Sequence, residues 1–498
     1  MAISANRLFS LESSLPGLKL SSTANVPLYR QVYQKLRAAI TSGKITAGTK
    51  LPATRTLAQT HGISRNTVLI AFEQLISEGY LEGRTGDGTY VAQGFSSNVS
   101  SDPANGLKNA KSSRQLSQRG VLLSKTLTTV KDFRNLAQPR AFRHGIGDLE
   151  MFPWDAWARL SARAARQPSN AILDYSDPAG YLPLRESIAA HLRATRAVNC
   201  SAQQVIVVTG SQQALLLCAQ MLLDPNEAAW FEQPGYMGAR GALIAAGVRV
   251  VGVPVDDAGL NISAGIRLEP AARLAYVTPS HQFPTGVTMS LERRQQLLAW
   301  ASQANAWIIE DDYDSEYRYD NRPLESLQSL DRDGRVIYCG TFSKSLFPGL
   351  RLGYMIVPEH LIQTFSNARA LLDRSPPGLT QTVLHAFMHE GHFARHIRRT
   401  KKAYVERQHA LRESLEKRLG DRLELRGFDA GMHLCAWLNF DVSDTEVSKL
   451  ATERNLEVIP VSALSDMPLE RGGLMLGYAA VTVEALRVGA KQLSKIIR

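Results

Sequence analysis

Cysteine is scarce in this sequence of 498 residues. The four that occur, Cys200, Cys218, Cys339 and Cys435, are far apart in the chain. Zinc sites and disulfide frameworks need cysteines in closely spaced sets, so we expect no metal site and no disulfide. Scattered free thiols fit a protein of the reducing cytoplasm.

Long hydrophobic runs are also missing, because no stretch reaches the ~18 apolar residues that a membrane span requires. Residues 1–17 contain no basic flank followed by an apolar stretch, so no secretion signal is expected. A chain of this length with 44% hydrophobic residues instead predicts two or three globular domains with sizeable cores.

Acidic residues do not balance the basic ones, and the formal net charge is +11. The whole excess lies in the first 141 residues, while the remainder of the chain is neutral by count. A localised positive charge favours a polyanionic partner, although a merely soluble basic tail has the same composition.

The composition divides the chain into three segments. Residues 26–94 have the pattern of a compact unit. Residues 95–141 are rich in Ser, Asn, Gln, Lys and Arg and predict a flexible linker with a short helix at residues 115–125. In residues 142–498, β-branched runs alternate with helical stretches, which is typical of a parallel sheet covered by helices. The last part of this segment predicts a smaller appended subdomain. The runs lie at residues 205–208, 249–253, 274–277, 306–310 and 335–339.

The first segment predicts three helices followed by a two-stranded wing at residues 80–91. Thr54 and Ser64 stand where N-caps of the second and third helices are expected. The expected helices span residues 28–42, 55–61 and 65–78. The third is expected to bury one stripe, formed by Val68, Leu69, Phe72, Leu75 and Ile76.

Short polar and basic side chains open this third helix, which is the second helix of a helix-turn-helix. Side chains at that place reach base edges in the major groove of DNA, and an arginine on the wing meets a phosphate or the minor groove. An ordinary solvated face of a small helical domain is the alternative. The candidate DNA contacts are Ser64, Arg65, Asn66, Thr67 and Arg84.

Three motifs make this segment resemble the GntR-type winged helix. They are G-x-x-L-P-x-[TS]-R-x-L-A at residues 48–58, S-R-x-T-V at residues 64–68 and G-x-G-T-[YF]-V at residues 86–91. The resemblance implies binding to a double-stranded DNA operator. It implies as contacts Arg55, Arg65, Thr67 and Arg84.

In the large segment the sharpest motif is GTFSKSLFPGLRLG at residues 340–353. Lys344 follows an apolar strand, which favours a buried amine able to form a Schiff base with an aldehyde cofactor. Arg351 offers a bidentate grip on a phosphate. A solvated surface lysine is the common alternative, but the apolar residues before it and the Gly/Pro-rich segment after it argue against that.

A second motif is a strand that ends in carboxylates and a tyrosine, IIEDDYD at residues 308–314. Pyridoxal phosphate works as an electron sink only while its ring nitrogen is protonated, and a buried aspartate supplies the counter-charge. Tyr313 is placed to hydrogen-bond the phenolic oxygen of such a ring. A divalent cation bound by the carboxylates is the alternative.

Two weaker signals accompany these motifs. VIVVTGSQQAL at residues 205–215 takes a strand through a Gly-Ser turn into a helix, whose first N–H groups attract phosphate. Tyr236, in a Pro-Gly-Tyr sequence, follows another strand and can stack on a flat ring.

Together the motifs resemble the aspartate-aminotransferase superfamily, fold type I, over residues 142–498. The resemblance implies pyridoxal 5'-phosphate as the cofactor and Lys344 as the lysine bonded to it. It implies Asp311 as the partner of the ring nitrogen, Tyr313 as the partner of the phenolic oxygen and Tyr236 as the stacking ring.

The same resemblance implies a phosphate site and a dimer. Tyr175, in LDYSDPAGYLPLRESIA, matches a tyrosine that reaches the phosphate of the neighbouring subunit. The implied phosphate ligands are Ser211, Gln212, Ser343 and Arg351.

Two positions depart from this pattern. Phe283, in SHQFPTG, stands where an asparagine that contacts the ring is expected, and Met475 stands where an arginine binds the substrate α-carboxylate. These departures disfavour ordinary transamination. Either Arg426 or Arg471 replaces the missing arginine, or the ligand has no carboxylate at that place.

End to end, the chain resembles the MocR/GabR regulators. The resemblance implies an α/β protein with an N-terminal winged helix-turn-helix, a fold-type-I aminotransferase-like domain with a parallel-rich sheet, and a small C-terminal subdomain. It implies a bacterial, cytoplasmic, PLP-dependent transcriptional regulator, associated with the nucleoid when bound to DNA as a head-to-tail homodimer. A small amine or amino-acid ligand, or the cofactor itself, would shift DNA affinity by favouring one state of the protein.

Two alternatives stay open at this point. One is a genuine PLP-dependent aminotransferase that carries a DNA-binding head, whereas the regulator is expected to keep residual activity at most. The other is a DNA-binding protein whose large domain only dimerises.

Overall fold

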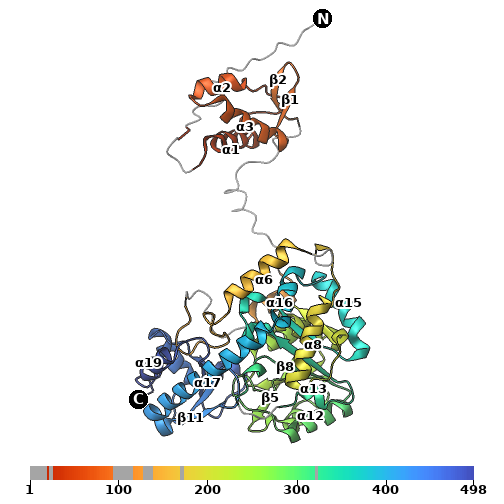
Figure 1. The fold of residues 1–498 in the computed structure, drawn as a ribbon, viewed down its shortest axis with the longest axis vertical. Helices are drawn as coiled ribbons and strands as arrows, with labels where there is room; N and C mark the ends of the chain where they lie inside the picture. Colours follow the sequence, from red (N-terminus) through yellow and green to blue (C-terminus); the bar gives the residue numbers. More distant parts are fainter. Residues whose placement is uncertain are drawn as a thin grey trace. The chain divides into compact units, whose positions relative to one another are not determined.

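The chain forms two compact units in this computed structural model, Met1–Gln115 and Leu116–Arg498, and each is described by itself. Figure 1 labels their helices and strands. The division falls inside the segment expected to be a linker. The described residues are 20–21, 26–93, 116–126, 138–168, 173–319 and 324–497.

Within its described residues, 20–21 and 26–93, the first unit shows three helices and one hairpin. Its core joins all of them, with Val32 of the first helix, Phe72 of the third and Val91 of the second strand fully or almost fully buried. The two strands pair antiparallel from Leu81 opposite Val91 to Arg84 opposite Gly88. The elements are α1 (Leu28–Thr41), α2 (Thr54–His61), α3 (Arg65–Ser77), β1 (Leu81–Arg84) and β2 (Gly88–Val91).

One of the two expected N-caps in this unit is confirmed. The Ser64 hydroxyl accepts the backbone N–H of Thr67 at 3.1 Å and so satisfies one free donor of α3. The expectation for Thr54 is wrong, because α2 already includes it and Ala53 is the N-cap, without a side-chain bond. The chain enters α2 from an extended residue before the threonine, which sequence spacing alone does not reveal.

The buried stripe of α3 differs from the expected one at two places. Leu69 and Ile76 are 38% and 41% exposed, and Ala71 is buried instead. Positions 68, 71, 72 and 75 lie on one face of a helix with 3.6 residues per turn, whereas 69 and 76 lie one step of about 100° away.

The linker helix is confirmed with a later start than residue 115. It is α5 (Gln118–Lys125), and the Ser117 hydroxyl caps it by accepting the N–H of Gly120. Arg119 donates a hydrogen bond to the carbonyl oxygen of Ala245 and so ties this helix to the large unit. The other linker residues, apart from 116–117, 126 and 138–141, lie outside the described residues.

The large unit is built on an eight-stranded sheet with the order β3-β10-β9-β8-β7-β4-β5-β6. β5, β4, β7, β8 and β9 run parallel, while β10 pairs antiparallel with both neighbours. All five expected runs are strands of this sheet. The strands are β3 (Val205–Val208), β4 (Ala228–Gln233), β5 (Arg249–Asp256), β6 (Gly259–Leu260), β7 (Leu274–Val277), β8 (Trp307–Asp312), β9 (Val336–Thr341) and β10 (Gly353–Ile356).

Helices cover both faces of this sheet. Ile206 and Val208 of β3 pack with residues of α9 and α10, while Val205 and Val207, on the opposite face, pack with residues of α8 and α16. This alternation follows from the period of two along a strand. The helices of this layer structure are α6 (Trp154–Arg166), α8 (Leu182–Arg196), α9 (Ser211–Leu222), α10 (Met237–Ala246), α11 (Ile262–Leu268), α12 (Leu291–Gln303), α13 (Leu327–Leu330), α14 (Phe342–Ser345), α15 (Ile362–Asp373) and α16 (Gly378–His389).

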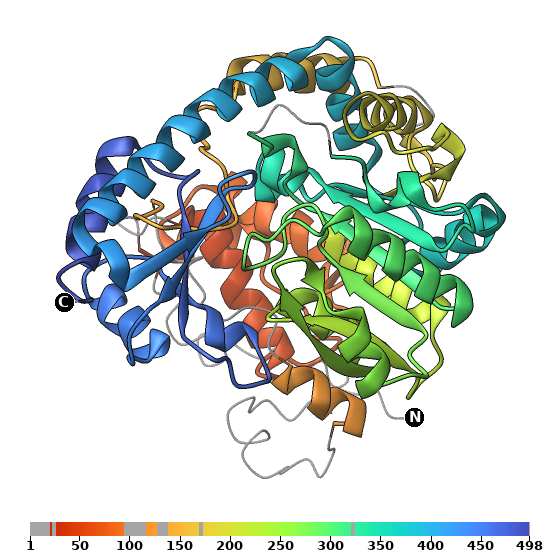
Figure 2. The ribbon, with the colours of Figure 1, turned by 90° about the horizontal axis from the view of Figure 1, so that it is seen from below.

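A smaller antiparallel sheet completes the unit, with the order β11-β12-β14-β13. The long helix α17 (His392–Leu419) runs from the large sheet to the small one, as Figure 2 shows from below. None of the described helices is long and apolar enough to cross a membrane. The remaining elements are β11 (Leu423–Arg426), β12 (His433–Leu438), α18 (Asp444–Glu453), β13 (Ile459–Pro460), β14 (Gly473–Gly477) and α19 (Val483–Leu493).

Candidate cofactor site and DNA-binding head

A cavity of about 370 Å³ opens where β8 and β9 end and α9 begins. Segments far apart in the sequence line it, which is typical of the carboxyl edge of an open α/β sheet. Eight of the nine residues expected to hold the cofactor line this one cavity. They are Tyr236, Ser211, Gln212, Asp311, Tyr313, Ser343, Lys344 and Arg351.

Lys344 lies in the short helix α14, directly after β9. The Thr341 hydroxyl caps this helix by accepting the N–H of Ser343 at 3.2 Å. The Lys344 amine donates to the carbonyl oxygen of Gly145 at 2.7 Å. Burial lowers the pKa of this amine below its usual value of 10.5. Desolvation therefore favours the neutral amine, which is the form that attacks an aldehyde.

Asp311, one residue before the end of β8, lines the cavity and has one unpaired oxygen. Its Oδ2 accepts the hydroxyl proton of Tyr276 at 2.8 Å, whereas its Oδ1 is buried and meets no hydrogen-bond partner among the described residues. Burial raises the pKa of this carboxyl from 3.8 to about 7. A protonated ring nitrogen would satisfy this oxygen and stabilise its charge, so the aspartate fits a pyridoxal ring.

The start of α9 forms a cradle beside a guanidinium. Gly210 is the N-cap residue at φ 120°, and a Cβ there would lie 3.1 Å from a terminal nitrogen of Arg351. Free N–H groups at a helix start and a facing arginine together suit a phosphate. Gln212, in contrast, uses its amide to bind the carbonyl oxygen of Gly238 at 2.8 Å.

Tyr236 caps the start of α10 with its backbone and turns its ring toward Phe283. The two ring centroids are 5.7 Å apart and the planes are nearly perpendicular, at 80°. Burial raises the pKa of the Tyr236 phenol to about 12, so the ring stays neutral. Phe283 therefore supplies an apolar edge where the family pattern has an amide.

Behind Tyr313 lies a polar group that the sequence analysis did not identify. Nδ1 of His281 is 3.0 Å from the Tyr313 oxygen and 3.1 Å from Oδ2 of Asp314. His281, Asp314 and His433 each offer an atom that could bind a metal ion, and these atoms lie within 4.8 Å of one another. His433 donates to the carbonyl oxygen of Pro284 at 3.2 Å, whereas Nε2 of His281 is buried without a partner among the described residues.

The sequence analysis also missed two other residues that line the cavity, Tyr276 and His144. Tyr276 stood inside an expected strand, and His144 in a stretch without a motif. A hydroxyl in an otherwise apolar buried strand was the only available signal for Tyr276, and it does not reveal that Asp311 lies on the neighbouring strand.

The carboxylates of the IIEDDYD motif do not gather around a common point. Glu310 accepts the backbone N–H groups of Leu327 and Gln328, both at 2.8 Å. Asp312 forms a buried ion pair with Arg196 at 2.8 Å. Glu310 and Asp312 share one face of β8, with Asp311 on the other, and the backbone N–H groups and Arg196 already bind the first two carboxylates.

Tyr175 is the one expected cofactor residue that the cavity does not include. Its side chain is 80% exposed, and the Arg374 guanidinium lies 5.2 Å from its ring.

The proposed replacements for the missing carboxylate arginine are engaged elsewhere. Arg426 forms ion pairs with Asp257 and Glu424, and Arg471 pairs with the same Glu424. Neither arginine lines the cavity, which disfavours both as partners of a ligand carboxylate there.

In the first unit, the expected DNA contacts lie at the surface. Arg55, Arg65 and Asn66 are exposed near the starts of α2 and α3, and Thr67 is half-buried. Arg84 on the wing is exposed, and its guanidinium stacks 4.3 Å from the ring centre of Tyr90. The Ser64 hydroxyl is occupied as the cap of α3 and bonds to the Thr67 side chain at 2.8 Å.

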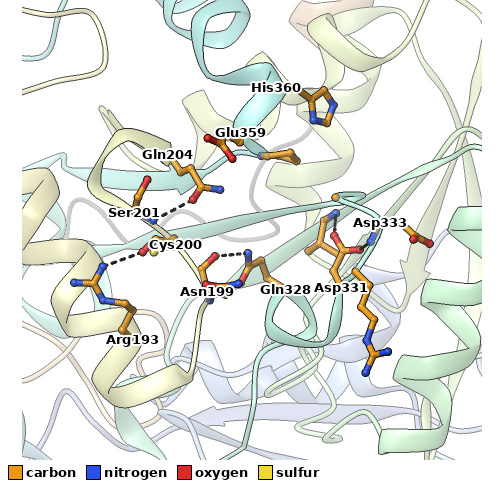
Figure 3. Close-up of a pocket in the computed structure, with 14 residues that line it drawn as sticks. Arg193, Asn199, Cys200, Ser201, Gln204, Gln328, Asp331, Asp333, Glu359 and His360 are labelled. Carbon is orange, nitrogen blue, oxygen red and sulfur yellow. Dashed lines mark hydrogen bonds between the residues drawn. The ribbon is translucent and has the colours of Figure 1, made fainter.

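A larger hollow of about 820 Å³ lies at the opposite edge of the sheet, near Val336 where β9 begins. Figure 3 shows its polar side chains bonded to nearby segments of the chain. Asn199 and Gln328 exchange two hydrogen bonds of 3.0 Å, and Arg193 donates to the carbonyl oxygen of Cys200 at 2.9 Å. These bonds hold the local structure together.

The fold and the cavity define a pyridoxal-phosphate-binding domain of fold type I joined to a winged helix. Residues 28–91 match the bacterial regulatory proteins of the gntR family, and residues 145–493 match the class I and II aminotransferases.

The chain is 40% identical over 484 residues to the probable rhizopine catabolism regulatory protein MocR of Rhizobium meliloti, covering 96% of this chain and 95% of that protein. It is 30% identical to the HTH-type transcriptional regulator TauR of Rhodobacter capsulatus, with coverage of 95% and 96%. The structure of LysN, an α-aminoadipate aminotransferase from Thermus thermophilus, is similar at a TM-score of 0.66 and 28% identity, covering 76% of this chain and 94% of that one.

The chain therefore belongs to the MocR/GabR-type transcriptional regulators. It combines a DNA-binding head of the gntR family with an aminotransferase-like domain whose cofactor is pyridoxal phosphate.

Proposed function

We propose that this regulator senses a small amine, an amino acid or pyridoxal phosphate itself through the cavity of its large unit, and converts occupancy into altered affinity for an operator. The observation that carries the proposal is the coincidence of two groups in one cavity. Lys344, with a buried amine, and Asp311, with one buried carboxylate oxygen that has no partner among the described residues, both line this cavity.

Residues of this chain have separate tasks in the proposal. The cofactor, when bound, supplies an aldehyde that links to an amine. Lys344 holds that link, Asp311 keeps a proton on the ring nitrogen, and Arg351 with the start of α9 holds the phosphate. Control of DNA binding then requires that the ligand bind one state of the protein better than the other.

In the head, Arg55, Arg65, Thr67 and Arg84 are proposed to contact DNA, with Asn66 beside them. Their exposure and their place at helix starts and on the wing support this role. Ser64 is proposed to act mainly by fixing the start of α3, since its hydroxyl is already bonded.

A head-to-tail homodimer is also part of the proposal. The exposed ring of Tyr175, outside its own cavity, supports a role at the cofactor phosphate of a second subunit. The proposed segments are residues 26–94 for the head, 95–141 for the linker and 142–498 for the sensing unit.

The proposed function is tested by replacing Lys344, which removes the side-chain amine that would bond to the cofactor. Lys344→Ala should abolish both the visible absorption of the loaded protein and the pyridoxyl group left by borohydride reduction, and its operator affinity should no longer respond to the cofactor. Lys417→Ala, which removes an exposed lysine at the end of α17, is the matched control. A Lys344→Ala protein whose DNA binding still responds like wild type would refute the proposal.

A further inference from the structure

Tyr313 has a buried polar partner to which the proposed function gives no task. Tyr313 is half-buried and lines the cavity, and its hydroxyl oxygen lies 3.0 Å from Nδ1 of His281. His281 follows β7 and Tyr313 follows β8, and these two strands are parallel neighbours in the large sheet. The carboxyl ends of neighbouring parallel strands meet at one edge of a sheet, which brings the two side chains together.

The same imidazole nitrogen also faces a carboxylate. Nδ1 of His281 lies 3.1 Å from Oδ2 of Asp314, and the two side chains are only 1% and 2% exposed. An ionised carboxylate accepts hydrogen bonds and donates none, so this contact requires a proton on Nδ1. A lone pair on Nδ1 would instead repel the carboxylate at a place where water screens that repulsion little.

The other ring nitrogen does not compete for this proton. Nε2 of His281 is buried and has no hydrogen-bond partner among the described residues. It adjoins two glycines, because a Cβ on Gly286 or Gly427 would lie 3.3 or 3.5 Å from it. Both tautomers leave Nε2 unsatisfied, whereas only a proton on Nδ1 also satisfies Asp314.

A proton on Nδ1 fixes the role of the Tyr313 hydroxyl. An Nδ1–H group has no lone pair with which to accept, so His281 shares its one proton between Asp314 and the Tyr313 oxygen. The hydroxyl proton of Tyr313 then lies on another side of its oxygen and is available to an acceptor in the cavity. In the reverse arrangement this proton would be held by the imidazole.

The adjoining lining makes the direction of this proton matter. Phe283 lines the cavity where the family pattern has an amide, and its ring centre is 6.1 Å from that of Tyr313. Of the amide and the hydroxyl that the family pattern has here, this chain keeps the hydroxyl. A phenolic oxygen of the cofactor therefore depends on Tyr313 for the hydrogen bond that the pattern supplies.

We infer that His281 is a positioning residue: with its Nδ1 proton held by Asp314, it directs the hydroxyl proton of Tyr313 to the phenolic oxygen of the cofactor. The inference rests on the proposed function, because it needs the cofactor in this cavity with its phenolic oxygen at Tyr313. It deepens that proposal by assigning to His281 and Asp314 the preference for a ring that carries this oxygen.

The experiment compares two aldehydes on the full chain, pyridoxal 5'-phosphate and 3-deoxypyridoxal 5'-phosphate, which lacks the phenolic oxygen. Equilibrium titrations give the ratio of their dissociation constants, and the intrinsic difference between the aldehydes is common to all variants. His281→Leu should reduce the preference for pyridoxal phosphate roughly three- to tenfold, as expected for one net hydrogen bond. An unchanged ratio in this variant overturns the inference.

Two control variants separate the lost donor from a general disturbance of the fold. His281→Asn places an amide N–H where Nδ1–H stood and should keep the wild-type ratio. His409→Leu, at an exposed position on α17, should keep it as well. A loss of preference in His281→Asn as large as in His281→Leu contradicts the role of the Nδ1 proton.

A double substitution shows whether His281 acts through Tyr313. Tyr313→Phe should by itself reduce the preference, and adding His281→Leu should then change it no further, because no hydroxyl is left to direct. If His281→Leu lowers the ratio equally in both backgrounds, its effect does not pass through the hydroxyl and the inference is wrong.

The tautomer of His281 is measured separately on the cofactor-free wild type, so a variant that fails to fold does not remove the test. Solid-state nitrogen NMR of the chain with isotope-labelled histidine should show a proton on Nδ1 at neutral pH. The His281 signal is the one that is missing from His281→Asn. A proton found on Nε2 and not on Nδ1 rejects the inference.

Borohydride labelling of wild type distinguishes this inference from the proposed function. A pyridoxyl group missing from Lys344 overturns the proposed function and the inference together. A labelled Lys344 combined with an unchanged ratio in His281→Leu overturns the role of His281 alone.

Discussion

Replacing Asp311 by asparagine should stabilise the cofactor-free protein at neutral and alkaline pH. The carboxyl is buried, and its pKa in the fold is raised from 3.8 to about 7, mainly by desolvation. Asparagine has nearly the same shape, and its oxygen can still accept the Tyr276 hydroxyl proton. The substitution therefore removes the charge and keeps the hydrogen bond.

The sign of the pH dependence follows from proton binding. Between about pH 4 and pH 7 the folded state holds the Asp311 proton more tightly than the unfolded chain does, so folding stability falls as the pH rises through this window. The asparagine variant lacks this loss. One pKa unit corresponds to about 1.4 kcal/mol, so the free energy of unfolding of the variant, relative to wild type, should rise by about 3 kcal/mol between pH 5 and pH 8.

Calorimetric unfolding of the cofactor-free full chain measures this effect. For a unit of this size about 0.8 kcal/mol corresponds to a shift of one degree in Tm, so the Tm difference between Asp311→Asn and wild type should grow by roughly 4 °C over this pH range. Asp441→Asn, at an exposed position, should show no comparable change.

A Tm difference between Asp311→Asn and wild type that stays constant from pH 5 to pH 8 would show that the buried charge is not the cause. Added pyridoxal phosphate should reverse the order, because it stabilises wild type by pairing with the carboxylate and asparagine offers no such charge.

Three further changes test the other parts of the site. Arg65→Ala should relax base preference by about 1–3 kcal/mol in a binding-site selection if Arg65 contacts a base edge, and an unchanged preference rejects that role. Gly210→Ala should weaken cofactor binding in an equilibrium titration, because φ 120° is strained for alanine and its Cβ would lie 3.1 Å from the Arg351 guanidinium; wild-type affinity would rule out the cradle. Tyr175→Phe should raise the Kd for the cofactor by roughly tenfold or more, as for a hydrogen bond to a charged group, and an unaltered Kd removes this hydroxyl from the phosphate site.

Much of the fold could be predicted because its signals are local. The β-branched runs at 205–208 and 274–277 are β3 and β7 with the expected bounds. The Ser64 cap needs only two residues three positions apart. The stripe of α3 was predicted less well, because Leu69 is apolar yet exposed, and apolar composition alone does not say which face is covered.

The candidate site could be predicted in part for a similar reason. Lys344, Asp311 and Arg351 each stand at the end of a strand or in a Gly/Pro-rich turn, so a short window of sequence carries the signal. The partners of these residues come from distant segments. Gly145 binds the Lys344 amine across 199 positions, and Tyr276 binds Asp311 from the neighbouring strand.

The order of residues alone thus dictated the types of element, the separation of a basic head from a neutral sensing unit, and the side chains suited to an aldehyde and a phosphate. Local chemistry is enough for these features, since backbone preferences and motifs act over a few residues. Only the packed chain decided which polar atoms of the described cavity lining remain without a partner. The pairing of Arg143 with Glu457 spans 314 positions, and Tyr276 occupies one oxygen of Asp311 while the other oxygen stays buried without a partner among the described residues. That distribution depends on which segments meet in space, and no short stretch of sequence contains it.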